Sequence, residues 1–299
     1  MAFLTLFSAP KPFSDAHINT IQRNAIRSWR MLGEAVQIIL VGEESGLVEA
    51  SRELGVMHLP QVRRNSQGTP LVSSIFDLAR QAGDSPLLGY VNADILLMPD
   101  FLSAARDMAS HASHFLLAGQ RWDLEVTGEM DFAAGWDERL KQECHLRGRL
   151  HLPAGSDYFI FPRGCYSEMP DFAIGRAGWD NWMIFQARRQ GWLAVDASES
   201  ITIVHQQHDY AHLPGGKSHH HLPETEENTY LAGGREITRF SLLDMDHRLI
   251  KGRLAGRRWT WSGLQRTIET LPLLKWNNYP LTARITSLFH RFKFKFQAS

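Results

Sequence analysis

Cysteine is scarce in this 299-residue chain, where only Cys144 and Cys165 occur. Two cysteines are too few for a disulfide framework, and their spacing is not that of a zinc site. We therefore expect both to be ordinary thiols.

Long hydrophobic runs are absent as well. No apolar segment reaches the roughly 18 residues of a membrane span, although 43% of the residues are hydrophobic. The first ten residues lack the basic start, long apolar centre and small-residue cleavage site of a signal peptide. No internal repeat is found. The sequence therefore predicts a cytoplasmic globular protein, with enough residues for one large domain or for a domain and an appendage.

The charges balance overall but not along the chain. Residues 248–299 contain 11 Lys and Arg against the single acid Glu269, which leaves 21 basic and 31 acidic residues in the preceding part. The last sixth of the chain is therefore a basic segment that suits an anionic surface.

The first sixty residues alternate between strand and helix patterns. Strands are expected at 2–8, 36–41 and 56–59, and a helix is expected to start at its N-cap Ser14 and to stop at Gly33. Alternation of this kind predicts an α/β fold, with a doubly wound, mostly parallel sheet flanked by helices.

A buried strand over 87–91 ends in the polar step Asn92-Ala93-Asp94, and Pro99 then opens a helix at its first position. Ligands bind at the carboxyl ends of the strands in an open α/β sheet. Two oxygen-bearing side chains there suit a divalent cation held against a phosphate. The alternative is that both residues only form the turn and cap the helix.

Two loops carry cations. Lys11 lies in the loop after the first strand, and Arg64 lies in a loop with Gly68, before a helix expected to start at Pro70. Arginine beside a flexible glycine suits a diphosphate, and the alternative for the second loop is a solvated basic turn.

The middle of the chain is less regular. Residues 121–153 are expected to form a long irregular insertion over the edge of the sheet, and loops of this length are usually functional or mobile. Further strands are expected at 114–119, 157–163, 193–195 and 201–205, and the segment 172–182 is expected to turn into a helix that ends near Gly191.

A polar, histidine-rich loop follows the strand at 201–205. His205, His208 and His212 are spaced so that they would also suit a metallohydrolase with a zinc ion. A surface loop with incidental histidines is the alternative.

Taken in order, these features resemble a GT-A-fold glycosyltransferase, the class that includes the family 2 enzymes. The resemblance spans residues 2–212 and rests on the strand and loop at Leu6-Phe7-Ser8-Ala9-Pro10, Gly42-Glu43 after the second strand, Arg64-Asn65-x-x-Gly68, Asn92-Ala93-Asp94, Trp179-Asp180-Asn181 and His205. Asn92 stands where the family has the first aspartate of Asp-x-Asp, and Glu43-Glu44 stands where it has paired aspartates.

The resemblance implies a metal-dependent transfer of a sugar from a nucleoside-diphosphate sugar to a hydroxyl of a saccharide or a lipid-linked glycan. Mn²⁺ or Mg²⁺ would be held by Asp94 with His205 and His208, and would neutralise charge on the leaving diphosphate. The donor-binding residues implied are Ser8, Ala9, Pro10, Lys11, Glu43, Arg64, Asn65, Gly68, Asn92 and Ala93.

Asp180 is the candidate catalytic base, because the glycines of Gly175-Arg176-Ala177-Gly178 free the backbone before it. An ordinary cap of the following helix is the alternative. The acceptor would be bound by Asp157, Tyr158, Arg163, Trp179, Asn181 and Trp182. The two tryptophans would stack on sugar rings, although their helical spacing is also compatible with the core.

A literal Asp-x-Asp occurs at Asp244-Met245-Asp246. The pattern of residues 237–249 predicts a helix, on which positions two apart do not face each other, so the pair is not expected to hold one ion.

The chain is therefore divided into a catalytic domain at 1–235 and a basic, mainly helical extension at 236–299. Cations are mixed with aromatic residues in Arg257-Arg258-Trp259-Thr260-Trp261 and in Phe289-His290-Arg291-Phe292-Lys293-Phe294-Lys295-Phe296, which suits peripheral binding to an anionic membrane. A dimer contact or an arm packed on the acidic body is the alternative, and no nucleic-acid motif accompanies the charge. Three other functions stay open: a nucleotidyltransferase of similar fold, a zinc hydrolase, and a binding protein without catalysis.

Overall fold

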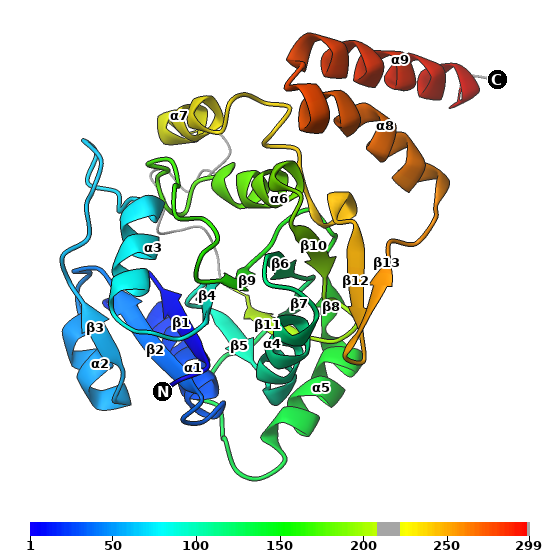
Figure 1. Ribbon diagram of the computed structural model, residues 1–299. Coiled ribbons are helices and arrows are strands. Elements are labelled where there is room, and N and C mark those ends of the chain that lie inside the picture. Colours follow the sequence, from blue (N-terminus) through cyan, green and yellow to red (C-terminus); the bar gives the residue numbers. More distant parts are fainter. Residues whose placement is uncertain (208–221, 298–299) are drawn as a thin grey trace.

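A nine-stranded sheet crosses the molecule in this computed structural model, which describes residues 1–207 and 222–297, with the backbone alone at 290–297. Its strand order is β13-β12-β10-β6-β9-β4-β1-β2-β3 (Figure 1). These strands are β1 (Leu4–Ser8), β2 (Val36–Val41), β3 (Met57–Leu59), β4 (Leu87–Val91), β6 (Phe115–Ala118), β9 (Tyr158–Pro162), β10 (Leu193–Asp196), β12 (His247–Ile250) and β13 (Arg253–Gly256).

Five of the eight strand pairs in this sheet are parallel. The central exception is β9, which runs antiparallel to both β4 and β6. Because β9 separates them, β4 and β6 still point the same way. The carboxyl ends of β1, β2, β4, β6 and β10 therefore meet at one edge, and the predicted mostly parallel α/β sheet is confirmed.

Helices cover both faces of the sheet (Figure 1). Two separate hydrophobic clusters lie on its two faces, one around Trp29 and Phe101 and the other around Phe76 and Trp179. Alternate residues of β1 supply both, since Leu4 and Leu6 join the first cluster and Phe7 the second. The helices of this part are α1 (Ala16–Arg30), α2 (Leu47–Leu54), α3 (Val72–Gln81), α4 (Pro99–His111), α5 (Trp136–Arg147), α6 (Trp179–Gln190) and α7 (Pro223–Leu231).

The observed starts of three helices can be compared with the starts predicted from capping residues and proline. Pro99 does open α4 at its first turn. The N-cap of α1 is Asp15 rather than Ser14, because the Asp15 carboxylate accepts the backbone N–H of Ile18. Helix α3 starts at Val72 instead of Pro70, since Pro70 pairs with Arg64 in an isolated bridge.

The segment at 121–153 is more regular than predicted. It contributes β7 (Trp122–Leu124), α5 and β8 (Arg149–Leu150). With β5 (Ile95–Leu97) and β11 (Ile203–Gln206), its strands form a second sheet of order β5-β11-β7-β8. Trp136, Leu140 and Cys144 of α5 pack beside this sheet. The small sheet positions the residues of the candidate site, because it brings three distant segments of the chain together as neighbouring strands.

The predicted helix at 237–249 is wrong. The segment contains a short 3-10 helix η3 (Leu242–Asp244), and β12 then joins the large sheet beside β10. Strands β12 and β13 therefore extend the sheet beyond residue 235. Only α8 (Trp261–Trp276) and α9 (Tyr279–Gln297) form the helical end, which lies beside the body in Figure 1. The division of the chain at 235/236 stays a prediction.

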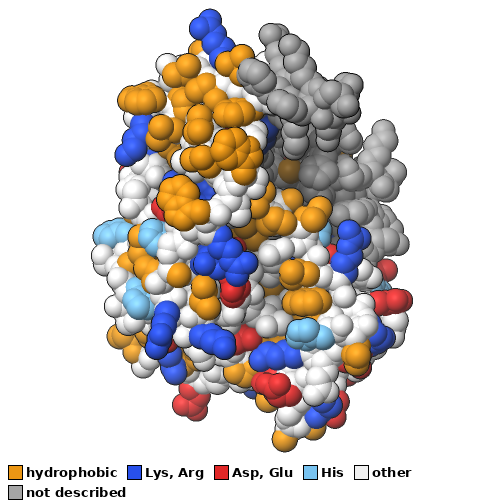
Figure 2. Space-filling view, turned by 90° about the vertical axis from the view of Figure 1, so that its right-hand side faces the viewer, with side chains coloured by type: hydrophobic (Ala, Val, Ile, Leu, Met, Phe, Trp, Pro, Cys, Tyr) orange, Lys and Arg blue, Asp and Glu red, His pale blue; other side chains and the backbone are white. Residues whose placement is uncertain are grey.

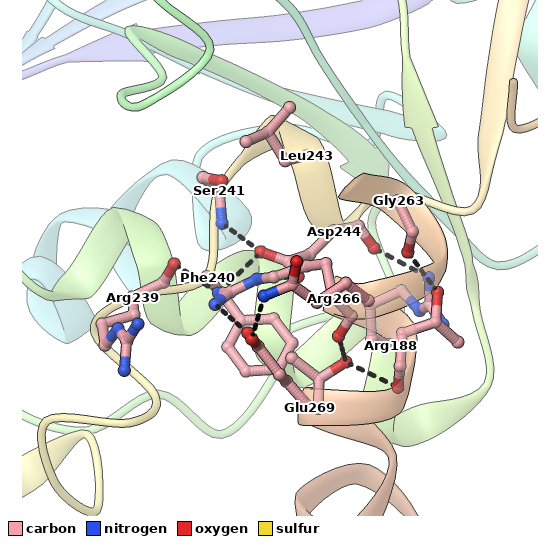
Figure 3. Close-up of polar contacts among 12 residues, drawn as sticks. Arg188, Arg239, Phe240, Ser241, Leu243, Asp244, Gly263, Arg266 and Glu269 are labelled. Carbon is pink, nitrogen blue, oxygen red and sulfur yellow. Dashed lines mark hydrogen bonds and ion pairs between the residues drawn. The ribbon is translucent and has the colours of Figure 1, made fainter. Parts of the chain in front are cut away.

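Asp244 of the literal Asp-x-Asp is already satisfied (Figure 3). Its carboxylate accepts the backbone N–H of Ser241 at 3.0 Å and the Arg266 guanidinium at 2.7 and 3.1 Å. Asp246 pairs instead with Arg188 and His247. The two carboxylates therefore join α8 and α6 to the sheet and do not share an ion.

Within the described ranges, no helix is both long enough and apolar enough to cross a lipid bilayer.

Candidate functional site

Asp94 follows β4 at the edge of the sheet where the parallel strands end. Its Oδ2 atom lies 3.8 Å from Nζ of Lys11, in the loop after the neighbouring strand β1, and 3.9 Å from Nε2 of His205. His205 arrives from β11, which pairs with β5 directly after Asp94. The structure thus brings together three of the residues selected from the sequence.

His205 is held in place by Asp123, a residue that no sequence motif indicated. The two residues are register partners in the parallel pair of β11 and β7, and Nδ1 of His205 lies 3.1 Å from Oδ1 of Asp123. The other carboxylate oxygen lies 2.9 Å from Nδ1 of His151. This contact directs Nε2 of His205 toward Asp94.

Asp123 is the most heavily bonded carboxylate of this group. Besides the two histidines, Nε of Arg121 donates to it at 2.8 Å. Burial raises the pKa of Asp123, but the hydrogen bonds from His205 and His151 and the charge of Arg121 outweigh burial and hold the pKa well below its usual range. Asp123 is therefore ionised and fixes the orientation of His205.

A divalent cation fits this donor set. Within residues 1–207 and 222–297, no group of three or more His, Cys, Asp and Glu side chains could by itself hold a metal ion. The protein offers the Asp94 carboxylate and Nε2 of His205. Mg²⁺ is usually bound through one or two carboxylates and the phosphates of the substrate, and a metal-bound histidine typically has a carboxylate behind it. His208 and His212 lie outside the described residues.

Asn92 does not point along with Asp94. Its amide oxygen accepts the Tyr90 hydroxyl at 2.9 Å, and its amide nitrogen donates to Asp157 at 2.9 Å. Ala93 between them is buried. Asn92 therefore fixes the turn from β4 to β5, and Asp94 is the oxygen donor of this turn that faces His205.

Asp157 connects this turn to Arg121. Arg121 Nη1 donates to both of its carboxylate oxygens, at 2.9 and 2.8 Å. The same guanidinium binds Asp123, so one arginine bridges the strand end at Asp157 and the carboxylate behind His205. Arg121 was also missed by the sequence analysis, because it lies in the segment expected to be irregular.

Asp180 lies on the same side of the sheet, at the start of α6. Burial raises the pKa of the Tyr90 hydroxyl, and the charges of Asp94, Asp157 and Asp180 raise it further, so all three carboxylates act on the same phenol. Burial also raises the pKa of Asp180 itself, while backbone N–H groups at the start of α6 lower it in part. Asp180 is thus a half-buried carboxyl with an increased proton affinity.

The loop after β1 is fixed by Gln22 of α1. The Lys11 backbone N–H donates to the Gln22 side chain at 2.7 Å, and the Gln22 amide donates back to the Lys11 carbonyl at 2.9 Å. Ala9 and Pro10 precede it in this loop. Burial lowers the pKa of Lys11, and Asp94 offsets part of that effect. The Ser8 hydroxyl is buried and has no hydrogen-bond partner among the described residues.

Arg64 belongs to a tight loop at the same edge. Its guanidinium binds the Gly68 carbonyl at 2.9 Å and Glu44 at 3.0 Å, whereas Glu43 is exposed. Gly68 has a φ of +82°, in the left-handed region that glycine adopts without strain. Glu44, not Glu43, therefore faces this loop.

Helix α7 closes onto the same loop through Glu224. Its carboxylate accepts the Asn65 amide at 2.7 Å and Nε of Arg176 at 2.7 Å. Burial raises the pKa of Glu224, but hydrogen bonds from Thr69, Asn65 and Arg176 outweigh burial and lower it. Glu224 thus joins two loops of the candidate site, and no sequence signal singled it out.

The structure does not place four of the predicted acceptor-binding residues, Tyr158, Arg163, Trp179 and Trp182, where they could bind an acceptor. Tyr158 is fully buried against Phe101, so it cannot line an open pocket. Arg163 lies at the opposite edge of the sheet, because β9 runs antiparallel to β4, and its guanidinium binds the carbonyls of Arg80 and Ser85.

The two tryptophans of α6 are core residues. Trp179 packs on Tyr90 and Phe159, and Trp182 packs on Phe172. Their exposed fractions are 6% and 7%, so neither offers a free face to a sugar ring. Asn181 between them donates to the Phe240 carbonyl at 2.6 Å.

No known family model and no curated protein matches this chain. Solved structures similar to it include glycosyltransferases. Mannosyltransferase PcManGT from Pyrobaculum calidifontis, in complex with GDP-Man and Mn²⁺, is 11% identical with a TM-score of 0.44, covering 68% of this chain and 56% of that chain. This chain therefore spans little more than half of PcManGT.

Glucosyl-3-phosphoglycerate synthase of M. tuberculosis is another such structure, at 12% identity and a TM-score of 0.45, covering 78% of this chain and 77% of that chain. The same enzyme in complex with Mn²⁺, UDP and glucosyl-3-phosphoglycerate gives 12% identity and a TM-score of 0.44, over 69% of this chain and 72% of that chain. These similarities are distant, so the function has to rest on the residues of the site.

Proposed function

We propose that this protein is a metal-dependent glycosyltransferase that uses a nucleoside-diphosphate sugar. The observation that carries the proposal is the position of Asp94, with Oδ2 3.9 Å from Nε2 of His205 and 3.8 Å from Lys11 at the carboxyl edge of the sheet. A carboxylate, an imidazole nitrogen and an ammonium group at this edge suit a cation that binds a diphosphate.

Asp94 and His205 would hold Mn²⁺ or Mg²⁺, which stabilises the negative charge that develops on a leaving diphosphate. Asp123 keeps the Nε2 atom of His205 available by holding its Nδ1 atom. Lys11 places a positive charge beside the same carboxylate and would contact the diphosphate as well. His208, also predicted as a ligand, remains part of the proposal from the sequence alone.

Asp180 is the residue we assign to the acceptor. A hydroxyl that attacks the sugar has to lose its proton, and a carboxylate within hydrogen-bond reach takes it up. Asp180 is half-buried, shares the surroundings of Tyr90 with Asp94 and has a raised pKa, which strengthens it as a base. Asp157 is less suited to this role because Arg121 occupies both of its oxygens.

A thermal-shift panel of nucleoside diphosphates and sugar nucleotides, with and without Mn²⁺, tests the proposal. We expect at least one of them to raise the melting temperature only when Mn²⁺ is present, since a ligand that binds the native state stabilises it. Asp94→Ala should abolish this shift. The matched control is Asp84→Ala, an exposed carboxylate before β4, at the other edge of the sheet. An equal shift in the Asp94 variant would remove Asp94 from the site, and tight zinc binding without nucleotide affinity would favour a hydrolase.

We further propose that α8 and α9 bind an anionic membrane, on which a lipid-linked acceptor would be found. Figure 2 shows hydrophobic side chains gathered over the upper part of one face, with Lys and Arg at its margin. Trp261, Leu264, Ile268 and Leu271 form an exposed stripe along α8, and Trp259 is 91% exposed beside them.

Charge supports the choice of partner. Residues 257–299 contain eight Lys and Arg and one acid. Exposed tryptophans beside basic residues are typical of helices that lie in the membrane interface, and the cytoplasmic leaflet carries negative charge. An anionic cytoplasmic surface is therefore the partner that this face fits best.

Sedimentation with phosphatidylcholine vesicles, with and without phosphatidylglycerol, tests the contact. We expect binding only to the anionic vesicles, weaker at high salt, and reduced at least tenfold in Trp259→Ala/Trp261→Ala. Leu146→Ala/Leu152→Ala removes two exposed apolar side chains elsewhere and should leave binding unchanged. Equal binding by both double variants would show that the stripe is not the contact.

A further inference from the structure

A depression lies between the edge of the large sheet and the first turn of α8. It has a volume of about 490 Å³. One wall is formed by Gln120, which follows β6, by Asp196 at the end of β10, and by Ser198 just after β10. The segments at 242–248 and 257–266 form the other, and we call this depression the arginine groove because Arg248, Arg257, Arg258 and Arg266 line it.

One carboxylate in this groove serves two guanidinium groups. Glu199 Oε1 lies 2.6 Å from Nη1 of Arg248 and 3.3 Å from Nη2 of Arg258. The Nε atom of Arg248 is buried and has no hydrogen-bond partner in the part of the chain that the structure describes. Arg248 and Arg258 together therefore carry one positive charge more than Glu199 neutralises.

Arg257 adds a further positive charge. Its guanidinium donates to the Leu243 carbonyl and, at 3.1 Å, to the Thr267 hydroxyl, and it forms no ion pair with a carboxylate of residues 1–207 or 222–297. Burial lowers the pKa of Arg257; the charge of Asp244 opposes this most strongly, the charges of Arg188 and Arg266 lower the pKa further, and Asp246 raises it. Charges of both signs therefore act on Arg257, and it is the guanidinium itself that carries the charge offered to a ligand.

Arg266 differs from the other three arginines. It is paired with Asp244 at 2.7 Å and with Glu269 at 3.7 Å, and it attaches α8 to the segment before β12 (Figure 3). Its role is structural. The charge available to a ligand comes from Arg257, Arg258 and Arg248.

The groove is connected to the candidate site through Gln120. The Gln120 side chain donates to the His151 carbonyl at 2.6 Å, and Nδ1 of His151 lies 2.9 Å from Asp123. Asp123 in turn holds His205. The wall of the groove and the group that would hold the metal therefore belong to one chain of contacts.

We infer that the arginine groove binds an anionic group, a phosphate or a carboxylate, of the acceptor. The inference rests on the proposed transferase function and deepens it by naming the charge of the acceptor. Guanidinium groups bind planar or tetrahedral oxyanions through paired hydrogen bonds. Binding of such a group here would place the rest of the acceptor beside the wall that leads toward Asp94 and His205, the residues that would hold the metal ion.

Titration calorimetry of the full chain with inorganic phosphate at constant ionic strength tests the inference. We expect saturable binding that falls at least tenfold in Arg257→Gln/Arg258→Gln. The control Arg30→Gln/Arg52→Gln removes the same net charge from exposed positions of α1 and α2 and should bind phosphate like the unchanged protein. Glu199→Gln should strengthen binding several-fold, because it frees the two guanidinium groups that share this carboxylate.

No phosphate binding by the unchanged protein, or equal binding in the Arg257/Arg258 and Arg30/Arg52 variants, would overturn the inference. Loss of phosphate binding in Lys11→Ala with full retention in the groove variant would also overturn it, because the anion would then occupy the donor site. Donor stabilisation by sugar nucleotide and Mn²⁺ is measured on the same samples. Its absence would defeat the transferase proposal while leaving the phosphate result intact.

Competition between inorganic phosphate and phosphatidylglycerol vesicles identifies the source of the anion. Displacement of the vesicles by phosphate would assign the groove to the headgroup of a lipid-linked acceptor. Phosphate binding without displacement would assign it to an acceptor in solution.

Discussion

His205 and Asp123 lie opposite each other in adjacent parallel strands, β11 and β7, with Nδ1 of His205 3.1 Å from Oδ1 of Asp123. The contact leaves only Nε2 of His205 to meet Asp94. Strand β7, which the sequence pattern did not indicate, therefore orients His205, which the sequence pattern did indicate.

Asp123→Asn should weaken the metal dependence of the protein. An amide keeps the shape of the side chain but loses the charge that holds His205 in the required orientation, and changes of this kind typically cost about 10–100-fold in metal affinity. The measurement is the Mn²⁺ concentration that gives half of the thermal shift produced by a sugar nucleotide. An unchanged Mn²⁺ requirement would contradict the role given to Asp123.

Asp180→Asn should lower kcat by about 10²-fold or more, as expected for loss of a general base, while donor binding stays intact. The chain offers a close control in Asp137→Asn, because Asp137 in α5 and Asp180 in α6 each follow a glycine N-cap and a first-turn tryptophan. The test compares kcat with the donor-induced thermal shift in both variants. If the two variants lose the same fraction of activity, Asp180 only stabilises the start of its helix and is not the base.

Glu224→Gln should lower the melting temperature at neutral pH by about 2–4 °C, as expected for roughly 1 kcal/mol in a chain of this size. Hydrogen bonds hold the pKa of folded Glu224 below its ordinary value of 4.5. The stability it contributes is therefore present above that value and is lost as the pH falls through the folded pKa. Melting curves of both proteins from neutral to acidic pH should converge at the acidic end. A constant gap would mean that the ionised carboxylate is not the source of the stability.

Trp179→Ala should destabilise the fold by about 3–5 kcal/mol, since a large aromatic side chain would leave a cavity between Tyr90 and Phe159. Trp261→Ala, at a position that is 80% exposed, should change stability by no more than about 0.5 kcal/mol. Urea denaturation measures both. A fully stable Trp179 variant with a weaker affinity for sugar would restore Trp179 as an acceptor platform.

The local elements were largely predictable. The strands of the β1 to β4 region, the step at Asn92-Ala93-Asp94 and the helix start at Pro99 follow from alternation, turn residues and proline chemistry, all of which act over a few residues. The position of Lys11 and Asp94 at one edge of the sheet also follows, because parallel neighbours end at the same edge, whereas their ion pair is seen only in the structure.

Other features depended on contacts between distant segments. Because β9 runs antiparallel to β4, Arg163 lies at the edge of the sheet opposite the candidate site. The strands β7 and β8 are too short to give a periodic pattern, so Arg121 and Asp123 were not predicted. An aromatic side chain such as Trp179 can stack on a sugar ring, and only the packing of α6 against the sheet shows that Trp179 belongs to the core.

The sequence by itself determined an α/β chain with a polar step at Asp94, a late His205 and a basic, aromatic end, because spacing and composition encode local geometry and net charge. The tertiary structure alone decided which carboxylate stands behind His205, which arginines lack a full complement of carboxylates in the groove, and which tryptophans are exposed. Those outcomes depend on strand register and direction and on burial, which arise only when segments far apart in the chain pack together.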